Sequence, residues 1–574
     1  MIEANRTRFR VWAPAQQTMS VAIHGGAAVP MTRSENGWFE AEVQCGAGTR
    51  YNYVLADGRS IPDPASRAQD GDVHGASIVV DPASYRWRHS EWRGRPWHET
   101  VIYELHAGAL GGYAGVVREL PRLAELGVTA VELMPIAEFP GARNWGYDGT
   151  LPYAPECSYG TPEDLRKLVD AAHGHGLMIF LDVVYNHFGP DGNYLPHLAP
   201  DMFRTDVTTP WGPAIDFRRA EVRRFFTENA LYWLLDYHFD GLRFDAVHAI
   251  TEPDWLDEMA SEVRSTIEPG RHVHLVLEND KNDAGHLTDH FDAQWNDDGH
   301  HVLHVLLTGE HEGYYADYAE APAVRLARCL KEGFIYQGEP SPHRGGKPRG
   351  SASAALPPTA FVLFLQNHDQ IGNRAFGERL TTLAEPRALE AATALQILAP
   401  QIPLIFMGEE TASEAPFLFF TDHNAELAKA VRDGRRREFA SFSQFSDPKL
   451  LAELPDPNAR ETFDRSKPNG HSERAAARNR LYRRLLTIRC REIVPRLAKA
   501  RALDAAAVGP AAVTARWRMG DGSQLSLVCN LGNSAVEITP PSGHVLFATS
   551  QTAEQDVVAG RLPAFSTVAL LDSE

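Results

Sequence analysis

Four apolar segments in the middle of the chain each end at or near a carboxylate. These acids are Asp182, Asp245, Glu278 and Asp369. A single acid after a strand more often caps a helix or lies on the surface. Four acids at one edge of a sheet repel one another and cost stability, unless they take part in chemistry or bind cations. The pattern therefore favours a functional site.

Two of these acids match the chemistry of retaining glycoside hydrolysis. That reaction needs a nucleophilic carboxylate and a carboxylic acid about 5–5.5 Å apart, and neighbouring strands, about 4.8 Å apart, can supply this spacing. We expect Asp245 to be the nucleophile, kept ionised by Arg243 on the same face of its strand. Glu278 follows an apolar run, so desolvation is expected to hold it protonated as the acid. Asp369 and His368 are expected to hold the sugar hydroxyls.

The segments that carry these residues belong to a regular alternation that starts near residue 98. Short apolar runs alternate with amphipathic stretches, a rhythm that predicts a parallel sheet with helices between its strands. Eight repeats favour a closed (β/α)8 TIM barrel with catalytic groups at the C-terminal ends of its strands, although the rhythm alone fits an open doubly wound sheet equally well. The expected strands are 101–106, 128–135, 177–182, 241–245, 272–278, 292–297, 359–367 and 403–408.

A chain of 574 residues is too long for one core, so two to four domains are expected. Residues 1–95 alternate in hydrophobicity around Asn-Gly and Asp-Gly turns and predict an N-terminal β-sandwich. The barrel is expected over 96–490, with an insertion near 300–355 close to its mouth. Within it, residues 435–475 are predicted as surface loops, followed by a basic helix around 473–491. A C-terminal β-sandwich domain is expected over 491–574.

Four motifs then occur in a characteristic order. They are DVVYNH (182–187), GLRFDAVH (241–248), the strand-end Glu278 and QNHDQIGN (366–373). Together they resemble the four motif regions of the α-amylase superfamily, glycoside hydrolase family 13. The resemblance implies that Asp245 is the nucleophile, Glu278 the acid/base and Asp369 the transition-state stabiliser. The substrate-binding residues expected around them are Tyr147, Asp148, Asn186, His187, Arg243, His248, Trp295, Asp298 and His368.

Further segments resemble one family within this superfamily, the malto-oligosyltrehalose trehalohydrolases. They are FRVWAP (9–14), YELHAG (103–108), RNWGYDG (143–149), QWNDDGHH (294–301), GEHEGYY (309–315) and PFLFFTDH (416–423). This resemblance implies hydrolysis of the α-1,4 bond next to a terminal trehalose, and functional coupling to a malto-oligosyltrehalose synthase in trehalose biosynthesis. Two alternatives remain: a branching enzyme or other α-glucan transferase with the same carboxylates, and a non-catalytic glucan-binding barrel. The last is the weakest, since all three carboxylates are present.

The composition of the chain limits the classes of molecule that it is expected to bind. The net charge of −19 argues against a nucleic acid or an anionic membrane, because either needs a basic face. A neutral α-glucan oligosaccharide ending in trehalose fits better. The first residues lack the apolar core of a signal peptide, the longest apolar stretch (391–408) contains polar residues and prolines, and five scattered cysteines suggest free thiols. A cytoplasmic location without a membrane span is expected.

Two ligand questions arise from single residue types. His301 and His304 fit one helical face, but no matching carboxylate accompanies them, and Asn186 corresponds to a calcium ligand of many α-amylases without the rest of a ligand set. No metal and no cofactor are therefore expected. Trp145 and Trp211 could be sugar platforms, although such aromatics are more often core residues.

Overall fold

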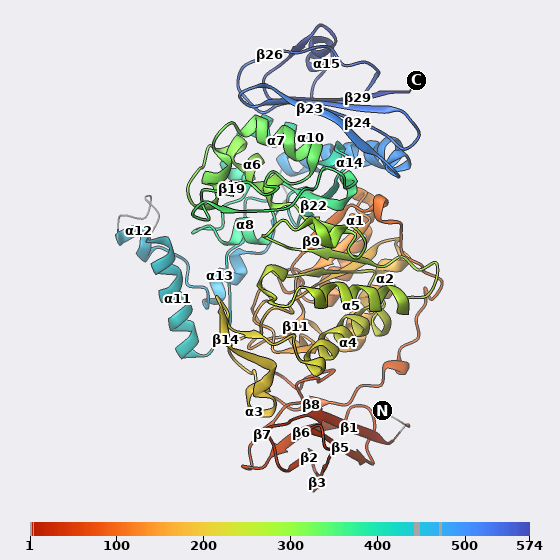
Figure 1. The fold of residues 1–574 in the computed structure, drawn as a ribbon, viewed down its shortest axis with the longest axis vertical. Helices are drawn as coiled ribbons and strands as arrows, with labels where there is room; N and C mark the ends of the chain where they lie inside the picture. Colours follow the sequence, from red (N-terminus) through yellow and green to blue (C-terminus); the bar gives the residue numbers. More distant parts are fainter. Residues whose placement is uncertain (1–2, 4, 441–447, 470–472, 574) are drawn as a thin grey trace.

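The computed structural model describes residues 3, 5–440, 448–469 and 473–573 (Figure 1). Its centre is a closed barrel of eight parallel strands, which confirms the barrel over the open sheet. Each of the eight predicted runs overlaps one strand. The strands are β9 (Ile102–Leu105), β10 (Ala130–Leu133), β13 (Met178–Val183), β16 (Gly241–Phe244), β17 (His274–Leu277), β18 (Ala293–Trp295), β21 (Phe361–Phe364) and β22 (Ile402–Phe406).

The barrel strands are apolar because both of their faces are covered. One set of side chains fills the interior, including Phe180, Trp295 and Phe364, and the other set packs against the surrounding helices. Local signals set the helix ends: a capping box of Thr161 and Asp164 starts α2. The main helices around the barrel are α1 (Tyr113–Leu126), α2 (Pro162–Gly174), α4 (Ala220–Asp236), α5 (Asp254–Thr266), α6 (Asp297–Thr308), α7 (Pro322–Glu332), α10 (Pro386–Leu398) and α14 (Glu473–Ile488).

Two β units flank the barrel at opposite ends of the long axis (Figure 1). The N-terminal unit has one sheet of β1 (Thr7–Trp12), β5 (Trp38–Val43) and β4 (Thr32–Arg33). Its second sheet orders β3 (Ala28–Pro30), β2 (Met19–Ile23), β6 (Arg50–Leu55) and β7 (Ser60–Ile61), with β8 (Ser77–Ile78) paired to β6. The predicted Asn36-Gly37 and Asp57-Gly58 turns join β4 to β5 and β6 to β7, with both glycines at positive φ.

The C-terminal unit is a five-stranded antiparallel sheet, beside which lie a two-stranded sheet and α15 (Gln551–Val558). The large sheet orders β23 (Arg501–Gly509), β24 (Ala512–Arg518), β25 (Gln524–Asn530), β29 (Ser566–Asp572) and β27 (His544–Ala548). The small sheet pairs β26 (Val536–Glu537) with β28 (Arg561–Leu562). Across the described ranges, no helix combines the length and apolarity that crossing a bilayer requires.

Two segments depart from a simple alternation of strand and helix. Between β18 and β21 the chain forms α6, a 3-10 turn at Gly313–Tyr318, α7 and the short pair β19 (Pro340–Ser341) and β20 (Lys347–Pro348). This is the region of the predicted insertion. The stretch 435–475, predicted as loops, contains the end of α11 (Ala425–Phe439), α12 (Pro448–Ala452) and α13 (Arg460–Arg465). These helices form because apolar residues such as Phe439 and Phe463 are buried; 441–447 and 470–472 lie outside the described residues.

Candidate active site

Arg243 is the centre of the acidic cluster at the C-terminal ends of the strands. Its side chain is 1% exposed and lies 4.2 Å from the centroid of the Trp295 ring. Nη1 donates to both oxygens of Asp182, at 2.9 and 2.7 Å, and to Oδ1 of Asp245 at 2.8 Å. Nη2 lies 3.0 Å from Oε2 of Glu278. One guanidinium therefore holds carboxylates from the ends of three adjacent strands, β13, β16 and β17.

This arrangement changes the expected distribution of charge between Asp245 and Glu278. Burial raises the pKa of Asp245 well above its usual range, despite the opposing effect of Arg243, and nearby Glu278 adds to the shift. Burial also acts to raise the pKa of Glu278, but Arg243 and the backbone N–H of Ala246 outweigh it, so that pKa lies below its ordinary value. Contrary to the prediction, desolvation alone therefore does not keep Glu278 protonated.

The Ala246 N–H contributes to this difference in pKa. It donates to Oε2 of Glu278 at 2.7 Å, and Ala246 itself has a left-handed backbone, with φ of +40°. An alanine rarely adopts this conformation, and such strain is typical of functional sites. Asp245 and Glu278 retain side-chain exposures of 11% and 16%, so both carboxyls can be reached from the mouth.

His368 contacts both Glu104 on a barrel strand and Tyr147 in the site. It begins α8 (His368–Gly372), and its Nδ1 contacts Oε1 of Glu104 on β9. Its Nε2 lies 2.8 Å from the hydroxyl of Tyr147, which donates to Oδ2 of Asp182 at 2.6 Å. Burial lowers the pKa of His368, but Glu104 and Asp369 raise it to about 9. Glu104 was missed in the sequence, where an acid within the apolar run 101–105 was the only signal.

Asp369 lies at the mouth, with 43% of its side chain exposed. Nδ2 of Asn373 donates to its Oδ1 at 3.3 Å. Asn373 also lines a cavity of about 660 Å³. The cavity is lined by residues 308–315 of the predicted insertion, by 373–376 and 378, and by 438, 439 and 450.

His187 and Trp211 form a stacked pair beside the acidic cluster. Nε2 of His187 lies 2.9 Å from the carbonyl oxygen of Tyr147, and Nδ1 lies 2.9 Å from Oδ1 of Asn186. The His187 ring is nearly parallel to Trp211, with centroids 4.9 Å apart. Trp211 is 46% exposed at the tip of the hairpin of β14 (Phe203–Thr209) and β15 (Gly212–Ile215), so the core interpretation was wrong for Trp211. Trp145, 3% exposed, is a core residue.

Asp148 and His248 have different surroundings. Asp148 accepts from Nδ2 of Asn144 at 2.7 Å and lies 3.4 Å from Nε2 of His423. The resulting contact ties the loop 416–423 to the site. The Nδ1 atom of His248 is buried without a hydrogen-bond partner, and the charge of His248 contributes to the lowered pKa of Glu278.

Two segments of the chain match known protein families. Residues 67–199 match the family model "Alpha amylase, catalytic domain", and residues 500–568 match a domain of unknown function, DUF3459. A malto-oligosyltrehalose trehalohydrolase of Deinococcus radiodurans is 44% identical over 495 residues, which cover 84% of this chain and 81% of the relative. One from Rhizobium sp. is 37% identical, with 98% of each chain covered. The chain belongs to the malto-oligosyltrehalose trehalohydrolase family.

A solved structure agrees with this assignment at the level of the whole fold. A provisionally named alpha amylase from Salmonella typhimurium superposes with a TM-score of 0.93 at 45% identity, over 100% of this chain and 99% of that one. Membership of the trehalohydrolase family and of the α-amylase superfamily agrees with the resemblance seen in the motifs.

In this trehalohydrolase family member, Asp298 is buried, although the sequence predicted that it binds substrate. Its carboxylate is 0% exposed and accepts from Arg349, Asn282 and Tyr318 and from the backbone N–H groups of residues 335 and 336. These donors fill its lone pairs, so Asp298 fixes the insertion to the barrel. Trp295, also expected to bind substrate, is 1% exposed beneath Arg243.

Asp297, the residue before it, faces the acids instead. Burial raises the pKa of Asp297 well above its usual range, and Glu278, Asp280 and Asp369 all act on it. The two positions diverge because consecutive residues of a helix point about 100° apart. The sequence pattern could not separate them, since both acids lie in the first turn of α6.

The histidines considered as metal ligands are held by protein groups. His304 Nε2 lies 2.7 Å from Glu310, and His300 contacts the carbonyl oxygen of Leu365 and the hydroxyl of Tyr315, at 2.6 and 3.1 Å. Around these imidazoles lie tyrosine rings, with Tyr315 stacked 4.2 Å from His304. His301 packs against the rings of Tyr314 and Tyr318, with centroids 4.8 and 5.0 Å away, and its Nδ1 is buried without a hydrogen-bond partner.

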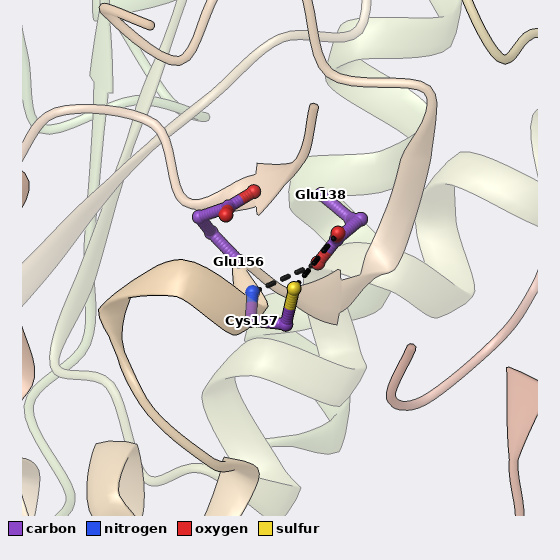
Figure 2. Close-up of side chains that lie close together, drawn as sticks. All are labelled: Glu138, Glu156 and Cys157. Atoms are coloured by element: carbon purple, nitrogen blue, oxygen red, sulfur yellow. Dashed lines mark hydrogen bonds between the residues drawn. The ribbon is translucent and has the colours of Figure 1, made fainter. Parts of the chain in front are cut away.

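A different group has the right atoms for a metal: Glu138, Glu156 and Cys157 (Figure 2). Here Glu138 accepts from the backbone N–H of Cys157 at 2.8 Å and from its thiol at 3.2 Å. Glu156 accepts the backbone N–H groups of Phe139 and Ser158. Burial raises the pKa of Glu138 well above its usual range, that of Glu156 to about 7, and that of the Cys157 thiol as well. The hydrogen bonds among these groups and to the backbone account for their packing against one another.

Proposed function

We propose that this protein hydrolyses the α-1,4-glucosidic bond next to the terminal trehalose of a malto-oligosyltrehalose, releases trehalose and retains the anomeric configuration. The observation that carries the proposal is the contact of one buried guanidinium, Arg243, with both Asp245 and Glu278. It brings two carboxyls from neighbouring strands to one point, as a retaining glycosidase requires. The relatives named malto-oligosyltrehalose trehalohydrolase support the substrate.

In the first step, Asp245 attacks the anomeric carbon and forms a glycosyl ester, while Glu278 donates a proton to the leaving oxygen of the trehalose unit. In the second, Glu278 takes a proton from water, and the resulting hydroxide displaces Asp245. The surroundings of the pair favour the proton on Asp245, whereas this mechanism needs it on Glu278, so the proton must move to Glu278 before Asp245 attacks. Asp369 and His368 are the groups proposed to hold the sugar hydroxyls.

The trehalose end must be selected by groups outside the catalytic acids. A pocket discriminates strongly when the wrong substrate leaves buried polar groups unpaired, by factors of roughly 10⁴. The cavity beside Asn373 supports a binding role for the insertion, because residues 308–315 line it. Exposed Trp211, stacked on His187, and the loop 416–423, tied to Asp148, are further candidates. Tyr147, Asn186, His248 and Asp297 complete the proposed substrate-binding set.

We further propose a cytoplasmic location and functional coupling to a synthase that makes the trehalose-ended substrate. The substrate assignment is tested by incubating the protein with maltohexaose and with its trehalose-ended analogue, followed by chromatography of the products. Trehalose released from the analogue, with maltohexaose cut far more slowly, is the expected result. Cleavage of both at similar kcat/KM would indicate a general amylase, and new α-1,6 branches would favour the transferase alternative.

A further inference from the structure

Glu104 lies inside the barrel, beneath the catalytic acids, and is 1% exposed. Its Oε1 contacts Nδ1 of His368, and its Oε2 accepts the backbone N–H of the same residue at 3.4 Å. Both carboxylate oxygens therefore face one histidine. A buried carboxylate is costly unless its charge is matched, so this pairing needs a cationic partner.

The hydrogen bonds around His368 define where its protons lie. Tyr147 has one hydroxyl proton and donates it to Oδ2 of Asp182 at 2.6 Å, where Arg243 also donates. The Tyr147 oxygen can then only accept from Nε2 of His368, 2.8 Å away. Nδ1 faces the Glu104 carboxylate, which also accepts. Both ring nitrogens must carry a proton, so the hydrogen-bond network requires an imidazolium.

Charged groups surround this imidazolium from several elements. Burial and Arg243 lower the pKa of His368, whereas Glu104 and Asp369 raise it to about 9. Glu104 makes the direct contact with the ring, while the nearest oxygen of Asp369 is 3.7 Å away. The imidazolium in turn lowers the pKa values of three neighbouring acids and one histidine, namely Glu132 on β10, Asp182 on β13, Glu278 just after β17 and His106 just after β9.

We propose that Glu104 is a positioning residue: it keeps His368 doubly protonated and turned so that Nε2 aligns the Tyr147 hydroxyl within the sugar subsite. The role in turnover rests on the proposed function. Through His368, Glu104 places a second cation beside Arg243 among the catalytic acids, which favours the ionised form of the carboxylates that must bind the substrate. It also fixes the Tyr147 ring, which lies nearly parallel to the imidazole with centroids 5.1 Å apart.

The decisive variant is Glu104→Gln, which keeps the shape and one acceptor for Nδ1–H but removes the charge. We expect the pKa of His368, about 9 in the native protein, to fall by at least one pH unit and the alkaline limb of the kcat/KM profile to move down with it, with the acid limb and KM little changed. Glu104→Asp restores the charge on a shorter side chain. We expect it to return the limb toward its native position at a reduced kcat.

Glu132→Gln is the matched control. Glu132 is the cross-strand partner of Glu104 on β10 and is equally buried, but burial raises its pKa well above the usual range, so it is already neutral. We expect its alkaline limb to coincide with that of the native enzyme. A Glu104→Gln limb that stays at its native position, or an equal shift in Glu132→Gln, would overturn the proposal.

A second readout does not depend on turnover. Histidine labelled with ¹³C at Cε1 reports ring protonation by NMR, and His368→Gln identifies its signal. We expect His368 to remain protonated at pH 8 in the native protein and to be largely neutral in Glu104→Gln. An unchanged titration contradicts the role of Glu104, even if the fold tolerates the variant poorly at higher temperature. A protein that titrates as expected but releases no trehalose would instead contradict the proposed function.

Discussion

Nη1 of Arg349 donates to Oδ1 of Asp298 at 2.8 Å, with both side chains buried. Arg349 lies at the end of the insertion, and Asp298 lies in the first turn of α6, shortly after the strand β18. This pair therefore joins the segment that lines the cavity to the barrel. Its loss should affect the insertion rather than the chemistry.

Asp298→Asn should lower the melting temperature by several degrees. The amide nitrogen would face the N–H groups that the carboxylate accepts, and breaking a buried ion pair costs about 3–5 kcal/mol. Asp297→Asn is the matched control, because it removes an acid whose pKa is already raised by burial and by neighbouring acids. Calorimetry on both variants checks this. Equal melting temperatures for Asp298→Asn and the native protein would contradict the anchoring role.

Asp245→Asn should abolish turnover while leaving the fold and sugar binding largely intact, because a carboxamide cannot form the glycosyl ester. The expected loss in kcat exceeds a hundredfold, about 2.7 kcal/mol in the barrier. Steady-state kinetics on the trehalose-ended substrate, with calorimetry of ligand binding, provides the measurement. A variant that keeps more than about a hundredth of the native rate would mean that the nucleophile lies elsewhere.

Glu278→Gln should separate substrates by their leaving groups. In the trehalose-ended substrate the trehalose unit leaves as a poor alkoxide and needs a proton, whereas the fluoride ion of a glycosyl fluoride leaves without one. We expect a large loss of kcat on the oligosaccharide and a much smaller loss on the fluoride. Asp245→Asn serves as the control, since it should fail on both. Equal losses of Glu278→Gln on the two substrates would remove Glu278 from the acid role.

Glu138→Gln should alter the pH dependence of stability. Because burial raises the pKa of Glu138, the folded state binds its proton more tightly than the unfolded state, and stability falls as pH rises above the ordinary carboxyl range. The variant cannot ionise, so its melting temperature should exceed that of the native protein at pH 8 and approach it at pH 4. A constant difference across this range would show that Glu138 does not titrate with folding.

Much of the fold was predictable because the relevant signals are local. A run such as 177–182 is apolar throughout since parallel strands are buried on both faces, and the eight runs recur with helices between them. The loops predicted over 435–475 were partly wrong because amphipathic helices such as α13 are short and gain their stability from burying a residue like Phe463.

The site was predictable as a set of residue types but not as a set of charges. Motif order suggested Asp245, Glu278 and Asp369, and the structure brings their strands together. The protonation of Glu278 depends on the Ala246 N–H, which is aimed by a strained backbone that no side-chain pattern reveals. Asp298 was predicted to bind substrate, but Asp297 is the acid near the catalytic carboxyls, for a similar reason. Residues distant in sequence donate all the hydrogen bonds that the Asp298 carboxylate can accept.

The exposed ring at the tip of the β14–β15 hairpin has a practical consequence. Trp211 is the one tryptophan of the described chain that is exposed, at 46%, whereas Trp233, Trp255, Trp295 and Trp517 are fully buried. A water-soluble quencher of indole fluorescence such as acrylamide should therefore reach Trp211 far more readily than those buried rings. Because Trp211 stacks on His187 beside the acids, an oligosaccharide in the cleft would shield it. The protein thus carries an intrinsic optical reporter of occupancy, usable even in variants that no longer turn over.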